Sequence, residues 1–190
     1  MGSALMVVDI QNDFCPGGSL GVSGADQIIP VVNWLIAKFE TVVYTRDWHP
    51  EGHVSFAANP RFADKSWPVH CVAGTWGAAF HPDLIVKADG IIVNKATRID
   101  REAYSGFQDT ELARTLRERK VDTLFITGLA TDYCVRASTL DALAEGFRVA
   151  VVTDAIRGVD VPVGSAQQAL RTMEAAGTRL ITSSEVEQHV

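Results

Sequence analysis

Short runs of consecutive hydrophobic residues recur along the chain and are separated by segments with helical spacing. The runs predict buried strands over residues 5–8, 41–45, 90–94, 123–127, 148–152 and 179–182. Runs that are continuous rather than alternating are typical of parallel strands covered on both faces. The pattern therefore favours a parallel sheet with helices packed against each side.

Between the strands, hydrophobic residues at helical spacing predict helices over residues 28–39, 109–121, 131–145 and 165–176. Gly146 and Gly177 follow the last two segments and favour helix ends there. We expect an α/β fold, a three-layer α-β-α sandwich around a six-stranded, mainly parallel sheet. The length of 190 residues suits one full hydrophobic core, so we expect a single domain over residues 1–190.

Composition narrows the classes of function. The net charge is -6, and no run of like charges gives an electrostatic case for nucleic acid. No hydrophobic run approaches the length of a membrane span, and the first residues lack the pattern of a signal peptide. Three cysteines without a secretion signal favour a reducing compartment. We expect a cytoplasmic protein, monomeric or homo-oligomeric, that binds neither nucleic acid nor membrane.

The most distinctive chemical feature is Cys134, which follows the predicted strand at residues 123–127 and begins the next helix. Free backbone N–H groups and the positive end of the helix dipole favour thiolate there, below the usual thiol pKa of about 8.5. A thiolate at such a turn is a candidate nucleophile. A buried cysteine that only packs is the alternative, and the turn alone leaves both open.

Polar residues also end other predicted strands, at Asp9, Asp47 and Lys95. Open parallel sheets bind ligands beyond the carboxyl ends of their strands, which favours a functional Cys134. We expect the strands that end at Asp9 and Lys95 to neighbour the Cys134 strand. Asp9 could then take the thiol proton, and Lys95 would hold the carboxylate ionised. An ordinary ion pair at the sheet edge is the alternative.

Asp47 and His49 stand two residues apart, so in extended backbone their side chains point the same way. With His70 as a third ligand, they form a two-histidine, one-carboxylate set that leaves a coordination position open. We expect one divalent ion, zinc in preference to iron or manganese. His53 is a further candidate ligand or a support for one. Because the pattern is short, three unrelated surface residues are the alternative.

Six motifs stand in order along nearly the whole chain, at residues 7–14, 45–50, 67–72, 95–96, 103–107 and 128–136. Together they resemble the nicotinamidase/pyrazinamidase branch of the isochorismatase-like cysteine hydrolases. The resemblance implies a catalytic triad that consists of Asp9, Lys95 and Cys134. It further implies a metal site with the ligands Asp47, His49 and His70. It also implies a cis peptide bond between Leu129 and Ala130, and an oxyanion hole made by the N–H groups of Ala130 and Cys134.

The activity that the resemblance implies is hydrolysis of nicotinamide, and also of pyrazinamide, in NAD salvage. On this interpretation a flat pocket for the pyridine ring is formed by Phe14, Trp67, Tyr104 and Leu129. A related cysteine amidase acting on another small amide or carbamoyl compound is one alternative. Others are a metallohydrolase in which Cys134 is structural, and a metal-binding or redox-sensing protein.

Overall fold

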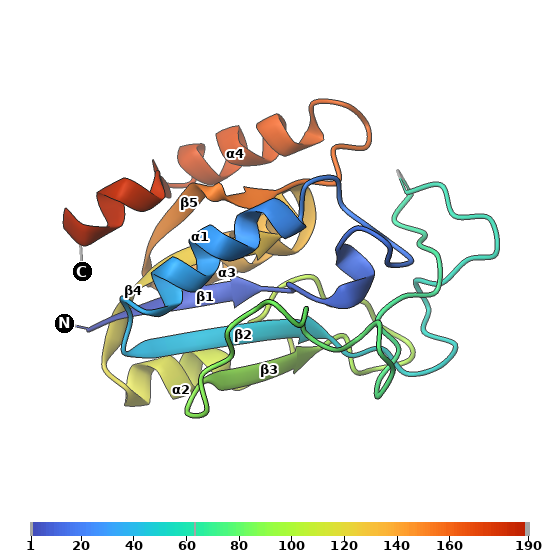
Figure 1. Ribbon diagram of the computed structural model, residues 1–190, viewed down its shortest axis with the longest axis horizontal. Helices are drawn as coiled ribbons and strands as arrows, with labels where there is room; N and C mark the ends of the chain where they lie inside the picture. The colour runs from blue at the N-terminus through green and yellow to red at the C-terminus, as the bar shows by residue number, and fades with distance from the viewer. Residues whose placement is uncertain (1, 63, 189–190) are drawn as a thin grey trace.

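The computed structural model describes residues 2–62 and 64–188, which fold around a six-stranded parallel sheet (Figure 1). The strands are β1 (Gly2–Val8), β2 (Thr41–Asp47), β3 (Ile91–Lys95), β4 (Val121–Leu129), β5 (Arg148–Arg157) and β6 (Arg179–Ile181). They lie in the order β3-β2-β1-β4-β5-β6, and each neighbouring pair is parallel. The winding therefore reverses between β1 and β4, which is where open α/β sheets form ligand sites.

The α-helices of the described chain are α1 (Ile29–Ile36), α2 (Leu112–Glu118), α3 (Arg136–Ala144) and α4 (Ser165–Ala175). Figure 1 shows α1 in front of the sheet and α3 behind it. Successive side chains of β1 point to opposite faces, so Leu5 and Val7 pack with α1, whereas Met6 and Val8 pack with α2 and α3. Both faces are buried, which explains the continuous hydrophobic runs and confirms the predicted α/β sandwich.

Element boundaries depart from the prediction in several places. Val121 was expected to continue a helix, but it begins β4, and β5 extends to Arg157. The helix predicted at residues 131–145 begins with one turn of π-helix, η3 (Thr131–Val135), before α3. Short 3-10 helices also form at η1 (Asn12–Phe14), η2 (Asp26–Ile28) and η4 (Ser183–Gln188). Segments of three to six residues are too short for a periodic pattern to predict them.

The long connection between β2 and β3 contains no α-helix among its described residues and extends beyond the carboxyl ends of the strands (Figure 1). Isolated bridges tie it together, one between His49 and Val72 and one between Phe56 and Trp67. This connection therefore brings histidine and aromatic residues to the edge of the sheet where β1, β2 and β3 end.

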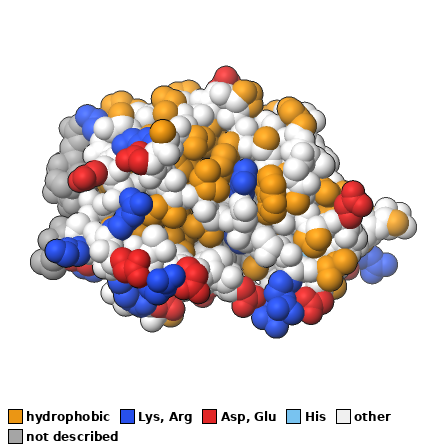
Figure 2. Space-filling view, turned by 90° about the horizontal axis from the view of Figure 1, so that it is seen from below, with side chains coloured by type: hydrophobic (Ala, Val, Ile, Leu, Met, Phe, Trp, Pro, Cys, Tyr) orange, Lys and Arg blue, Asp and Glu red, His pale blue; other side chains and the backbone are white. Residues whose placement is uncertain are grey.

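Figure 2 shows the face of the molecule seen from below, where hydrophobic side chains gather across the middle. Acidic and basic side chains lie beside one another along its rim, so no broad area of one sign forms on this face. Within the described residues, no helix is both long enough and apolar enough to span a bilayer.

Candidate active site

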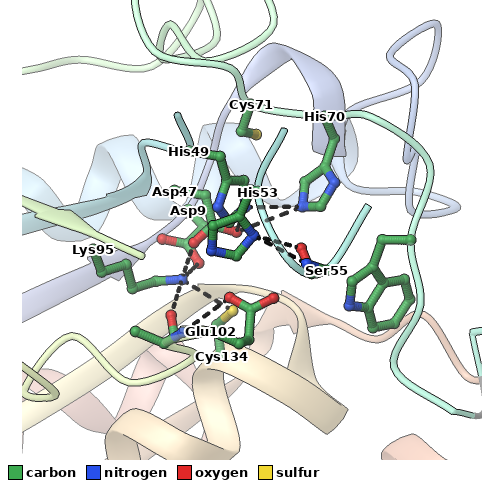
Figure 3. A network of polar contacts seen from close by, with 12 residues as sticks. Asp9, Asp47, His49, His53, Ser55, His70, Cys71, Lys95, Glu102 and Cys134 are labelled. Atoms are coloured by element: carbon green, nitrogen blue, oxygen red, sulfur yellow. Dashed lines mark hydrogen bonds and ion pairs between the residues drawn. The ribbon is translucent and has the colours of Figure 1, made fainter. Parts of the chain in front are cut away.

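Four buried polar side chains meet at the carboxyl edge of the sheet (Figure 3). Asp9 follows β1, Asp47 and Lys95 are register partners at the ends of β2 and β3, and Cys134 lies in η3 after β4. Lys95 Nζ lies 2.9 Å from Asp9 Oδ2 and 3.2 Å from Cys134 Sγ. It also donates a hydrogen bond to Asp47 Oδ1. One ammonium group therefore contacts both carboxylates and the thiol.

The position of Lys95 corrects one expectation about this cluster. The strand that ends at Lys95 does not neighbour the Cys134 strand, because β2 and β1 separate β3 from β4. Of these two strands, only β1, which ends before Asp9, pairs with β4. Lys95 reaches Cys134 because its long side chain extends from the end of β3 toward the other three groups (Figure 3).

The surroundings of Cys134 favour the thiol rather than the thiolate. Burial raises the pKa of Cys134 well above its ordinary value, Lys95 opposes this shift, and Asp9 adds to it. The expected lowering of the thiol pKa by the helix N-terminus is therefore wrong here, because loss of solvation outweighs it. Burial also raises the pKa of Asp9, although Lys95 opposes that shift. A carboxylate with a raised pKa is a better acceptor for the thiol proton.

Asp47 and Lys95 remain charged despite their burial. Burial would raise the pKa of Asp47, but Lys95 and the two nearby histidines hold it far below its usual range. Burial would lower the pKa of Lys95, but Asp47 and Asp9 raise it well above its ordinary value. Neither group is suited to exchange a proton with Cys134, which leaves Asp9 for that role.

Two features define the backbone next to Cys134, a cis peptide bond and a set of hydrogen bonds to Asp132. The peptide bond between Leu129 and Ala130 is cis, as the resemblance implied. Next to Cys134, the Asp132 carboxylate accepts hydrogen bonds of 2.6–2.9 Å from the Val159 and Asp160 N–H groups and the Ser165 hydroxyl. Asp132 thus ties the turn after β4 to the segment after β5.

The geometry of Asp47, His49 and His70 fits a divalent cation. The two histidine Nε2 atoms lie 3.2 Å apart, and they lie 3.6 Å (His49) and 3.9 Å (His70) from Asp47 Oδ2. Ligands about 2.0–2.1 Å from a tetrahedral zinc ion lie roughly 3.3–3.5 Å from one another. His70 Nδ1 faces the Pro68 carbonyl at 2.8 Å, which favours a proton on Nδ1 and leaves Nε2 to bind the ion.

His53 supports this group from one side. Its Nδ1 lies 2.8 Å from Ser55 Oγ, and its Nε2 lies 3.0 Å from the Arg101 carbonyl oxygen. Its ring stacks on His49 with a centroid distance of 4.2 Å. Because both ring nitrogens have protein partners, His53 contributes a ring contact to His49 in this conformation rather than a ligand atom. Glu102, which was not predicted, lies close to His49 and His53. The three side chains offer possible ligand atoms that all lie within 4.8 Å of one another.

A single cavity is lined by Cys134, Asp47 and His70 together. The rest of its lining is mostly hydrophobic or aromatic, and consists of Phe14, Leu20, Trp67, Glu102, Tyr104, Ala130, Tyr133 and Val159. Trp67 Nε1 donates a hydrogen bond of 3.0 Å to Tyr104 Oη, which fixes the two rings relative to each other. The aromatic lining suits one small planar molecule.

Three of the four predicted pocket residues, Phe14, Trp67 and Tyr104, line this cavity. Leu129 does not, because its side chain is fully buried in the hydrophobic core beside α1. The predicted oxyanion-hole residues Ala130 and Cys134 both reach the cavity. Asp9 and Lys95 lie behind Cys134 and contact the cavity only through it and Asp47.

Two buried positioning residues were missed by the sequence prediction. The Gln11 side chain donates to the Asp47 carbonyl oxygen and accepts from the Asp47 N–H, at 2.8 Å each. Thr45 Oγ1 donates to Asp9 Oδ1 at 2.7 Å. Both residues fall within the motifs at residues 7–14 and 45–50, but those segments alone do not indicate these contacts, which arise from the pairing of β1 with β2.

We expect Gln11→Leu to weaken zinc binding roughly 10–100-fold, because residues that orient a metal ligand contribute on that scale. Zinc affinity is measured by competition with a chromogenic chelator. Gln167→Leu is the matched control, since Gln167 is exposed on α4. Equal zinc affinity in wild type and Gln11→Leu would show that Gln11 does not position Asp47.

Known proteins resemble this chain over nearly its whole length. A family model described as the Isochorismatase domain matches residues 3–185. A nicotinamidase of Acinetobacter baylyi is 41% identical over 201 residues, which cover 96% of this chain and 94% of the relative. The pyrazinamidase of Pyrococcus horikoshii in complex with zinc has a TM-score of 0.87 at 45% identity, covering 96% of this chain and 99% of that one. PnC1 of L. infantum in complex with nicotinate has a TM-score of 0.87 at 31% identity, covering 96% and 93%.

Proposed function

Because this chain belongs to the isochorismatase domain family, we propose that it hydrolyses nicotinamide to nicotinate and ammonia with Cys134 as the nucleophile. The observation that carries this proposal is a single cavity that joins Cys134 to Asp47 and His70 between aromatic walls. A planar pyridine ring suits aromatic faces, and its carboxamide then reaches the thiol. The nicotinamidase and pyrazinamidase relatives act on amides of this shape, which supports the same substrate class here.

The reaction begins with transfer of the Cys134 proton to Asp9, whose carboxylate oxygen lies within 4.8 Å of the sulfur. The Lys95 ammonium, 3.2 Å from Cys134 Sγ, stabilises the thiolate as it forms. The thiolate attacks the carboxamide carbon, and Asp9 returns the proton to the departing nitrogen, so ammonia leaves and a thioester remains. Asp9 then accepts a proton from water as that water attacks the thioester, and it returns this proton to the Cys134 sulfur as the carbon–sulfur bond breaks. Nicotinic acid leaves and ionises to nicotinate in solution, and the thiol and the Asp9 carboxylate are restored.

The N–H groups of Ala130 and Cys134 form the proposed oxyanion hole. Both residues line the cavity, and the cis peptide bond precedes Ala130 directly. Donors placed where negative charge develops contribute on the order of 10²–10³ in rate for each donor.

Asp47, His49 and His70 hold the proposed divalent ion, and we propose zinc in preference to iron or manganese, which this ligand set also accepts. When bound, the ion supplies a Lewis acid that anchors the ring nitrogen of the substrate. Phe14, Trp67 and Tyr104 enclose the ring from the remaining sides. The ligands therefore serve recognition, whereas Asp9, Lys95 and Cys134 carry out the chemistry.

The setting of this activity follows from the same chemistry. Nicotinate is a precursor of pyridine nucleotides, so the reaction belongs to NAD salvage. All three cysteines are free and buried, which supports a reducing, cytoplasmic environment. One domain over residues 1–190 is sufficient for the proposed reaction, because the residues assigned to it either line one cavity or have side-chain atoms within 4.8 Å of residues that line it.

We expect the purified protein to release ammonia from nicotinamide and pyrazinamide, and to lose at least about tenfold in rate after removal of its metal by a chelator. The ion anchors the ring, so added zinc restores the rate. A coupled ammonia assay measures both effects. Ammonia release from a carbamoyl compound but not from nicotinamide would instead favour the related amidase. An undiminished rate in the chelated, metal-free protein would show that no ion is needed.

A further inference from the structure

Glu102 is a carboxylate in the cavity that the proposed reaction does not use. It lies between β3 and α2, is half-buried, and lines the cavity together with Cys134. Figure 3 shows its side chain directed toward the polar cluster. Its carboxylate lies within 4.8 Å of possible ligand atoms of His49 and His53. Glu102 therefore faces the space in which a substrate would lie.

The orientation of Glu102 is fixed by its own loop. Its Oε1 accepts a hydrogen bond of 2.9 Å from the Ala103 N–H, and its main-chain carbonyl accepts one of 3.0 Å from Gln108 Nε2. The Ala103 carbonyl in turn lies 3.4 Å from Lys95 Nζ. These contacts connect the Glu102 segment to the catalytic cluster and hold the carboxylate at the cavity.

No lysine or arginine in the described part of the chain forms an ion pair with Glu102. The two arginines on the same loop pair elsewhere, Arg98 with Asp100 and Arg101 with Asp109. Lys95 is already shared between Asp9 and Asp47. The negative charge of Glu102 is therefore not matched by a neighbouring cationic side chain.

The substrate and the product of the proposed reaction differ at the group that Cys134 attacks, and Glu102 lines the same cavity as Cys134. The amide is neutral and carries N–H donors, whereas the acid is an anion without donors. A carboxylate accepts hydrogen bonds and repels a nearby anion, and repulsion is strong where water is partly excluded. A divalent ion at Asp47, His49 and His70 would attract the anionic product, and Glu102 opposes that attraction.

We propose that Glu102 is a specificity-determining residue that favours the neutral amide over the anionic acid in the cavity. The inference rests on the proposed function, because it concerns the substrate and product of that reaction. Through Glu102 the protein rejects carboxylates and limits inhibition by its own product. Like-charge repulsion of this kind discriminates between ligands of nearly identical shape.

The dissociation constants of nicotinamide and nicotinate, measured calorimetrically with the zinc-loaded protein, test this role. The Cys134→Ala background prevents turnover. Glu102→Gln removes the charge but keeps an oxygen for the Ala103 N–H. We expect it to tighten nicotinate binding roughly tenfold and to change nicotinamide binding less than about threefold. Asp100→Asn is the matched control, because it removes a charge from the same loop where the side chain is 63% exposed.

An unchanged ratio of the two dissociation constants in Glu102→Gln overturns the inference, and so does an equal change in Asp100→Asn. Melting curves establish that each variant is folded. If Glu102→Gln does not fold, Glu102→Ala is measured in its place. An unchanged ratio of the two dissociation constants in Glu102→Ala overturns the inference in the same way. Failure of both ligands to bind in the Cys134→Ala background would refute the proposed function itself, and the inference with it. Binding of nicotinamide with no shift for nicotinate refutes only the role of Glu102.

Discussion

Replacing Cys134 with alanine is expected to lower the rate of nicotinamide hydrolysis by at least about 10⁴-fold, because no acyl intermediate can form without the sulfur. Zinc content stays unchanged, since the proposed ligands are Asp47, His49 and His70. The fold also persists, because alanine fits the volume left by the thiol. The ammonia assay gives the rate, elemental analysis gives the zinc content, and circular dichroism checks the fold.

Cys15→Ala is the matched control for this experiment. Cys15 is also buried, burial raises its pKa to about 11, and it does not line the cavity. We expect its activity to stay within a few-fold of wild type. If Cys134→Ala kept a tenth of the wild-type rate, the nucleophile would have to be something other than this thiol, and the metallohydrolase alternative would gain support.

Replacing Lys95 with methionine is expected to destabilise the metal-free protein by about 3–5 kcal/mol, the usual cost of removing one partner of a buried ion pair. Asp9 and Asp47 would then face each other in the interior without a cation, with carboxylate oxygens within 4.8 Å. Activity would fall as well, because the thiolate loses its neighbouring charge. Urea unfolding followed by fluorescence measures the loss of stability.

Two further measurements separate this charge effect from a simple packing defect. The double variant Lys95→Met with Asp9→Asn leaves one buried carboxylate instead of two, so it should recover part of the lost stability. The deficit of Lys95→Met should also shrink as the pH is lowered, because carboxylates with raised pKa values bind protons more readily in the folded protein. A deficit that is the same at every pH and in the double variant would indicate packing alone.

Much of the fold was predictable because strands that are buried on both faces of the sheet are continuous hydrophobic runs in the sequence. Leu5 and Val7 enter one core and Met6 and Val8 the other, so their run is continuous. The boundary between α2 and β4 was missed because Val121 satisfies helical spacing equally well. The order of the strands leaves no local record, which is why Lys95 was assigned to the wrong neighbour.

The candidate site also has features that the sequence predicted and features that it could not predict. Asp9, Asp47 and Lys95 could be predicted as site residues because polar residues at the ends of hydrophobic strands stand out, and Cys134 because it lies in the turn that follows such a strand. The pKa of Cys134 could not be predicted, because it depends on how much water the folded protein excludes. The contacts of Gln11 and Glu102 could not be predicted either, because their partners are distant in the sequence.

The formation of a thioester on Cys134 is the central step of the proposed reaction, and a single-turnover experiment tests it most directly. Protein in excess is mixed with nicotinamide and quenched with acid at successive times, and the Cys134 peptide is analysed by mass spectrometry. We predict that ammonia forms in step with a nicotinoyl group on Cys134, which then decays to nicotinate. Ammonia and nicotinate appearing together, with Cys134 unmodified at every time point, would contradict it.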